Sequence, residues 1–229
     1  MKKICSIFAL SSLLFAGVAA AQDDTNAVYS ANVVGVVKYT IPAGGAFACF
    51  SLPLNPMSSG GDWLWGDTQI AKDLPNGSQV YFWENNGWEP ASKTKKYGWG
   101  EAASRSVSAG EAFFVQGPKT AEAQTVSLLG ELSMEATEPL TFTGNKAYDL
   151  VAGNPYPVET TFVDSELAAG LDNGSTVFVW RNNAWIGYDK TKKYGWQDAA
   201  GLTFAVGEGI FVKKAGDPAT INVEAPFNF

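Results

Sequence analysis

The sequence predicts an all-β protein made of two tandem copies of an antiparallel, sandwich-like or barrel-like unit. Three observations support this. A stretch of 40 residues recurs later in the chain in similar form, and short segments rich in Val, Phe, Tyr and Trp are bounded by Gly, Pro and Asn. Helical periodicity is scarce. Only FVDSELAAGL (162–171) has the pattern of a short helix. Such a pattern is typical of antiparallel sheets joined by tight turns.

The internal repeat defines the predicted domain boundaries. Residues 76–115 match residues 173–212 without a gap, and 21 of the 40 positions are identical. Upstream, ACFSLPLNP (48–56) aligns with AYDLVAGNP (147–155), 99 positions apart instead of 97. Because self-similarity at a fixed spacing indicates duplicated structural units, we expect three segments after the N-terminus. These are a first β repeat at 22–133, a linker at 134–140 and a second β repeat at 141–229.

The predicted strands follow the same order in each copy. In the first copy they are 32–41, 46–54, 78–84, 87–92, 111–116 and 124–131. In the second copy they are 140–143, 147–152, 175–181, 184–189, 208–213 and 219–225.

Each copy is expected to contain a hairpin with a two-residue Asn-Asn loop. Gly87 of the first copy corresponds to Ala184 of the second, so this position does not require a positive φ. The loops are then 85–86 and 182–183, since Asn tolerates the left-handed region.

This hairpin register pairs tryptophans across the strands. Trp83 lies opposite Trp88 and Trp180 opposite Trp185, at the positions where cross-strand side chains approach most closely. We interpret the pairs as core packing; the alternative is a platform on which sugars stack.

The first 21 residues have the pattern of a secretory signal peptide. Lys2 and Lys3 supply positive charge, 4–16 is mostly apolar, and 19–21 is an Ala-Ala-Ala cleavage site. The apolar run is too short for a stable membrane span, and no later segment is apolar enough. We therefore expect a secreted or cell-surface protein, with the periplasm as an alternative.

Composition argues against several partners and chemistries. Without the signal, 14 basic and 23 acidic residues would give a net charge of −9, which disfavours nucleic acid. There is no histidine, and Cys49 would be the one cysteine of the mature chain, so His-dependent catalysis and His or thiolate metal sites are excluded. Glu111 and Glu208 hold equivalent places in separate copies, which does not predict two carboxylates in one cleft. We expect no catalytic residue, no metal and no cofactor.

The heptapeptide KTKKYGW occurs at 93–99 and, without a difference, at 190–196. Alternation along an extended segment would place four side chains of each copy on one face. These eight residues are the candidate contact site: Lys93, Lys95, Tyr97, Trp99, Lys190, Lys192, Tyr194 and Trp196.

Two interpretations of the heptapeptide remain open. Lysines on an exposed strand edge would prevent edge-to-edge pairing, with Tyr and Trp anchoring the segment to the core. Alternatively the segment is a duplicated contact site, where lysines meet an acidic subunit or an anionic polysaccharide and the aromatic rings supply contact area.

Several segments resemble a family of secreted bacterial proteins. YSANVVGVVKYTIPAGGAFACFSLPLNP, the VYFW hairpin, AGEAFFVQ, GNPYPVE and VGEGIFV together resemble functionally uncharacterised secreted proteins of verrucomicrobial and lentisphaeral type bacteria. The resemblance implies secretion and an all-β fold, and it assigns no active site.

The sequence thus predicts a secreted, non-catalytic structural or surface-associated protein that acts through protein–protein contacts. Its partner would be itself or another cell-surface protein. The alternative is a carbohydrate-binding module that binds a polysaccharide through exposed Trp and Tyr. The exposure of Trp63, Trp65, Trp99 and Trp196 distinguishes the two.

Overall fold

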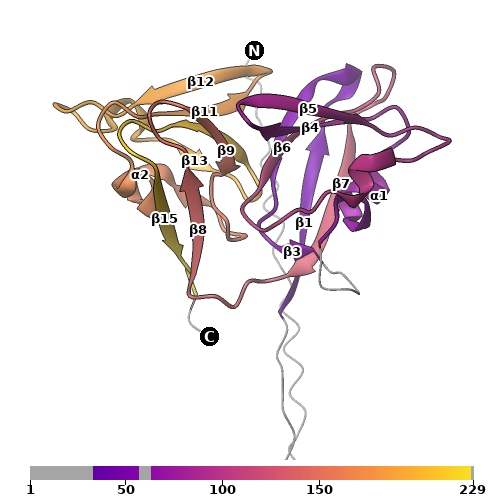
Figure 1. The fold of residues 1–229 in the computed structure, drawn as a ribbon, viewed down its shortest axis with the longest axis horizontal. Helices are drawn as coiled ribbons and strands as arrows, with labels where there is room; N and C mark the ends of the chain where they lie inside the picture. Colours follow the sequence, from indigo (N-terminus) through magenta and orange to yellow (C-terminus); the bar gives the residue numbers. More distant parts are fainter. Residues whose placement is uncertain (1–32, 57–62, 228–229) are drawn as a thin grey trace, which may run out of the picture. The chain divides into compact units, whose positions relative to one another are not determined.

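The all-β prediction is confirmed. The computed structural model describes residues 33–56 and 63–227, in which β-strands form several antiparallel sheets and the helices are short (Figure 1). The strands are rich in β-branched and aromatic residues, which fit a pleated, half-buried surface. The expected signal peptide, 1–21, lies outside the described residues.

The first half contains a four-stranded sheet, β2-β6-β4-β5, and a three-stranded sheet, β1-β7-β3. The strands are β1 (Val34–Ile41), β2 (Phe47–Ser51), β3 (Asn55–Pro56), β4 (Gln79–Glu84), β5 (Gly87–Ser92), β6 (Ala112–Gln116) and β7 (Gln124–Glu131). Along β1 the burial alternates, so that Val37, Tyr39 and Ile41 point into a core shared with both sheets.

The second half has a matching four-stranded sheet, β9-β14-β11-β12, and two two-stranded sheets, β15-β8 and β10-β13. Its strands are β8 (Thr137–Phe142), β9 (Tyr148–Ala152), β10 (Thr160–Thr161), β11 (Thr176–Arg181), β12 (Ala184–Asp189), β13 (Thr203–Phe204), β14 (Gly209–Lys213) and β15 (Ala219–Glu224). A separate core fills this half. Residues 137–140, expected in the linker, belong to β8; Pro139 is tolerated there because β8 pairs with β15 on one side only among the described strands.

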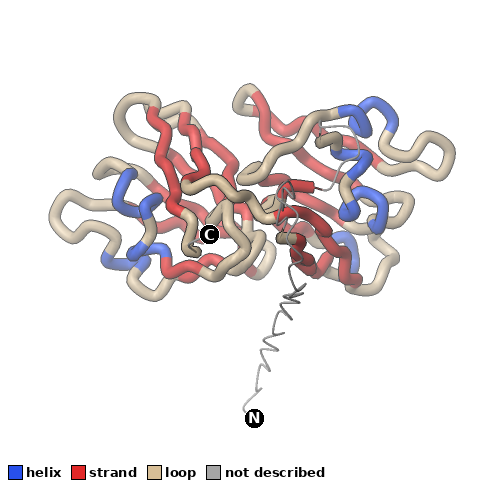
Figure 2. The backbone as a smooth tube through the Cα atoms, turned by 90° about the horizontal axis from the view of Figure 1, so that it is seen from below, coloured by secondary structure: helices blue, strands red, loops and turns tan. Residues whose placement is uncertain are grey.

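Two short helices hold equivalent places in the halves, α1 (Gln69–Asp73) and α2 (Glu166–Gly170). The sequence predicted a helix at 162–171 and missed α1. Thr68 and Ser165 cap them by accepting a hydrogen bond from the backbone N–H three residues later. The 3₁₀ helices are η1 (Ala43–Gly45), η2 (Trp65–Asp67), η3 (Gly100–Ser104), η4 (Phe162–Asp164) and η5 (Gln197–Ala199). In Figure 2 helices lie along the outer parts of both halves.

Both Asn-Asn hairpins form as predicted. Asn85 and Asn86 have φ of 50° and 59°, and Asn182 and Asn183 have φ of 54° and 61°. Positive φ at both loop residues matches the twist of the flanking strands. The register is the predicted one, with each tryptophan opposite its partner.

Matched hydrogen bonds join the two halves, which belong to one compact unit, Asn32–Phe229. The indole of Trp83 donates to the Tyr148 carbonyl at 2.7 Å, and the indole of Trp180 donates to the Phe47 carbonyl at 3.0 Å. Phe47 pairs with Gln116, and Tyr148 with the corresponding residue of β14. The β2 and β9 strands therefore correspond at a spacing of 101 residues, and the predicted spacing of 99 is wrong at this point.

The tryptophan pairs pack between the halves and not within the core of either half. Phe114 contacts Trp88, Trp180 and Trp185, with ring centroids 5.2–5.4 Å apart. The equivalent Phe211 contacts Trp83, Trp88 and Trp185 at 4.9–5.5 Å. Such tilted and edge-to-face ring pairs each add about 0.5–1.5 kcal/mol of stability beyond that from the buried apolar area. The rings therefore stabilise the contact between the halves.

Candidate contact site

The KTKKYGW segments form tight loops and not the extended segments that we expected. In the first loop Thr94 and Gly98 exchange two backbone hydrogen bonds, at 2.7 and 2.9 Å, and the Tyr97 N–H donates to the Thr94 hydroxyl. Gly98 has a φ of 57°, which favours glycine. Thr191, Tyr194 and Gly195 repeat these bonds in the second loop. The loops are not sheet edges, so the edge-protection interpretation loses its structural basis.

The first lysine of each loop binds the end of a helix. Lys93 donates to the carbonyls of Ala71, Lys72 and Leu74 at 2.6–2.9 Å. Burial lowers the pKa of the Lys93 amine, and the charge of Asp73 opposes this shift. A cation is stabilised there because the last carbonyls of a helix have no partner within it.

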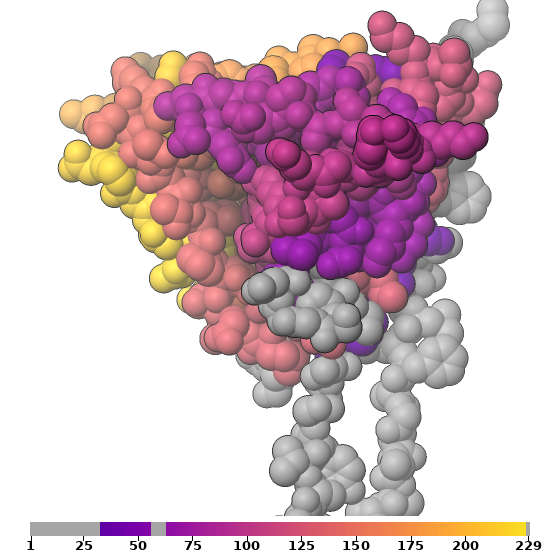
Figure 3. All heavy atoms as spheres, turned by 45° about the vertical axis from the view of Figure 1, so that its right-hand side comes forward, coloured from indigo at the N-terminus to yellow at the C-terminus, as the bar shows by residue number. Residues whose placement is uncertain are grey.

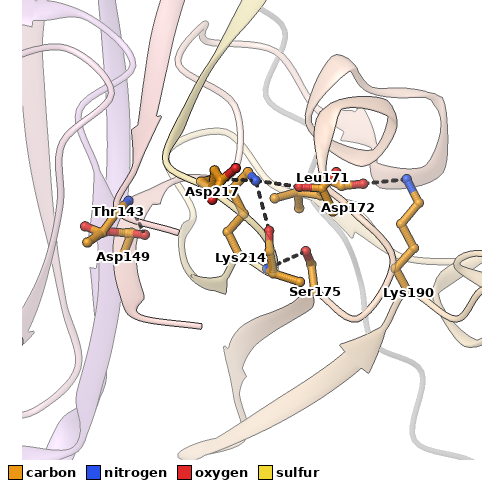
Figure 4. Close-up of polar contacts among 9 residues, drawn as sticks. Thr143, Asp149, Leu171, Asp172, Ser175, Lys190, Lys214 and Asp217 are labelled. Atoms are coloured by element: carbon orange, nitrogen blue, oxygen red, sulfur yellow. Dashed lines mark hydrogen bonds and ion pairs between the residues drawn. The ribbon is translucent and has the colours of Figure 1, made fainter. Parts of the chain in front are cut away.

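Lys190 repeats this arrangement on α2. It donates to the carbonyls of Ala168 and Leu171 at 2.9 and 2.7 Å, and Figure 4 shows the bond to Leu171. In the same region Lys214, almost fully buried, binds Asp172 at 2.6 Å and the Asp217 carbonyl at 2.8 Å.

The tryptophan of each loop is also structural. Trp99 and Trp196 are 7% and 8% exposed. Their indoles donate to the carbonyls of Ala71 and Ala168, both at 2.9 Å. Half of the eight predicted site residues thus fix the loops to the helices: Lys93, Trp99, Lys190 and Trp196.

The middle of each loop makes no such contact. We call Lys95–Tyr97 and Lys192–Tyr194 the Lys-Lys-Tyr tips. Their lysines are exposed, and Tyr97 and Tyr194 are 67% and 58% exposed. In each tip the second lysine lies 4.7 Å from the centre of the tyrosine ring, a cation–π distance. Figures 1 and 2 place the loops that follow β5 and β12 at opposite ends of the described part.

The other tryptophans are poorly placed for stacking on a sugar. Of the eight, all in the described part, only Trp88 is exposed, at 40%. Trp65 is fully buried and Trp63 is half-buried. The Trp88 ring also contacts the rings of Trp83, Phe114 and Phe211 in edge-to-face geometry.

Sequence reasoning missed a hollow of about 510 Å³ in the first half, on β4, β5 and η3. Phe82, Pro90, Ala91 and Trp99 form its apolar part, and Glu84, Glu89, Glu101 and Arg105 are its charged residues. Figure 3 shows this half from the side, with the residues near position 100 in magenta. The sequence signal was weak: the first half has glutamates at 84, 89 and 101, whereas the second half has Arg, Ile and Asp at the corresponding positions.

Glu111 and Glu208 stabilise turns. Glu111 binds Arg105 at 2.5 Å and accepts a bond from the Ser108 N–H. Glu208 binds Arg181 at 3.2 Å and accepts from the Ala205 N–H. Burial raises the pKa of the Glu111 carboxyl, although Arg105 opposes the shift.

No protein-family model, curated protein or solved structure matches the chain. Within residues 33–56 and 63–227, no helix has the length and apolar character needed to cross a membrane. The same residues hold no cluster of three or more His, Cys, Asp or Glu side chains that could bind a metal ion.

Proposed function

We propose that this is a secreted, non-catalytic structural or surface-associated protein that acts through protein–protein contacts at its two Lys-Lys-Tyr tips. One observation carries the proposal. Four of the seven KTKKYGW residues, the first Lys, the Thr, the Gly and the Trp, shape the loop or bind the protein's interior, so the fold explains why they are identical in both loops. The exposed Lys-Lys-Tyr residues have no such role and are nevertheless identical. A pre-formed pair of exposed tyrosine and lysine suits contact with an acidic protein surface.

The carbohydrate-binding alternative is less well supported. Sugar stacking needs an accessible aromatic face, whereas seven of the eight tryptophans are buried or half-buried. Trp65 and Trp99 pack in the core of the first half, and Trp196 packs in the core of the second half.

A photo-crosslinking experiment tests the proposal. A benzoylphenylalanine residue replaces Tyr97 or Tyr194 in the exported protein, and Met134, an exposed residue remote in sequence from both tips, is the control position. We expect discrete protein adducts from positions 97 and 194 and none from 134. Adducts that are sensitive to periodate and contain no second protein would favour the carbohydrate-binding alternative instead.

A further inference from the structure

The hollow on β4, β5 and η3 combines an apolar surface with free carboxylates. Arg105 lies 3.8 Å from the centre of the Phe82 ring and is already paired with Glu84 at 2.6 Å and with Glu111. Glu89 and Glu101 are exposed and form no ion pair within the described part of the chain. The hollow thus presents two uncompensated negative charges beside Pro90 and Ala91.

The second half does not reproduce this chemistry. Ile186, Gly187 and Tyr188 hold the positions of Glu89, Pro90 and Ala91. Tyr188 is half-buried and packs against the second core. The tips are therefore duplicated, whereas the acidic hollow belongs to one half.

We propose that the hollow binds a Lys-Lys-Tyr tip of a second copy of this chain. The inference rests on the proposed function and names its partner. The two ammonium groups of a tip match the charges of Glu89 and Glu101, and the tyrosine ring matches Pro90 and the adjoining apolar surface. The hollow is open to the surface, and its volume of about 510 Å³ lies within the range of ligand sites in proteins.

This contact would join unlike surfaces, a tip of one copy and the hollow of another. Contacts between unlike surfaces can repeat from copy to copy and build chains. Each copy carries tips at opposite ends of its described part (Figure 1), which leaves one tip accessible when the other is engaged.

Complementary variants test the inference by sedimentation velocity at low ionic strength. The hollow variant is Glu89→Gln with Glu101→Gln. The tip variant is Lys95→Gln, Lys96→Gln, Lys192→Gln and Lys193→Gln. The matched control is Glu122→Gln with Asp198→Asn, which changes the net charge by the same amount as the hollow variant. Both control residues are exposed, and Asp198 is the counterpart of Glu101 in the second half.

We expect wild type and control to associate with equal affinity and to dissociate as salt is added, because exposed charges are screened over roughly 8–10 Å. Each variant alone should associate about tenfold more weakly, the effect of losing two exposed charge contacts. Mixed together, they should form complexes, since the hollow variant keeps its tips and the tip variant keeps its hollow.

A monomeric wild type, a hollow variant that associates like the control, or a mixture that forms no complex would overturn the inference. The proposed function would survive those results if crosslinks from the tips still reach another protein. It would fail separately if positions 97 and 194 give no protein adduct.

Discussion

Replacing Lys190 by Met tests whether this lysine stabilises the fold. Its ammonium binds two carbonyls at the end of α2, at 2.9 and 2.7 Å, and lies 5.8 Å from the Trp196 ring centre. Met keeps most of the aliphatic stem but donates no hydrogen bond. The change therefore isolates the contribution of the charged group.

The magnitude follows from these contacts. A hydrogen bond to a charged group contributes about 1.5–3 kcal/mol net. Two such bonds on one partly exposed group are not additive, so we expect a loss of about 2 kcal/mol in the free energy of unfolding. For a unit of this size that corresponds to roughly 4–8 °C in Tm.

Lys192→Met is the matched control, since it makes the same change two residues further along the same loop. Lys192 is exposed, and its side chain makes no hydrogen bond within residues 33–56 and 63–227, so its replacement should alter stability by no more than about 0.5 kcal/mol. Urea unfolding followed by tryptophan fluorescence measures both. Equal effects of the two changes would refute the division of the heptapeptide into structural residues and a free tip.

Three further predictions concern packing and pH. Gly209→Ala should lower the free energy of unfolding by about 1–3 kcal/mol, because a Cβ there would lie 2.7 Å from Cys49 Sγ and from the Phe50 carbonyl oxygen. Gly201→Ala, the control with open space around the added Cβ, should change it by no more than about 0.5 kcal/mol, and thermal unfolding compares the two. Phe211→Ala should destabilise by about 3–5 kcal/mol in urea unfolding, since its ring contacts three tryptophans between the halves. Burial, helped by the charges of Glu138 and Glu135, raises the pKa of Tyr156 to about 12, so its stabilising contribution is complete below the unfolded-state pKa near 10 and is lost as the pH rises through 12. Tyr156→Phe should be less stable at neutral pH, through the lost bond to the Glu135 carbonyl, and should show a smaller alkaline decline in unfolding experiments, since burial also raises the pKa of Tyr39 and Tyr81.

Local signals in the sequence were sufficient to predict most of the strands. The Asn pairs predicted both hairpin loops and their register because a two-residue loop leaves one pairing that keeps the apolar residues aligned. The helix α1 was missed because QIAKD has two apolar residues, whereas ELAAG of α2, which has the same length, has three that are strong helix formers.

The candidate site was only partly predictable. The tips were found because the heptapeptide is repeated. The structural roles of Lys93 and Lys190 depend on helices more than fifteen residues away in the sequence, and spacing within the heptapeptide carries no sign of them. The hollow depends on how η3 packs beside β4 and β5, which is a tertiary property.

Hydroxyl-radical footprinting with mass spectrometry, on dilute and concentrated protein, tests the central claim most directly. We predict that Tyr97 and Tyr194 are oxidised in dilute protein and are only partly protected in concentrated protein, because each copy has two tips and one hollow, while Trp99 and Trp196 are protected in both. Oxidation of these tryptophans in dilute protein, or tyrosine oxidation that does not change with concentration, would contradict the account.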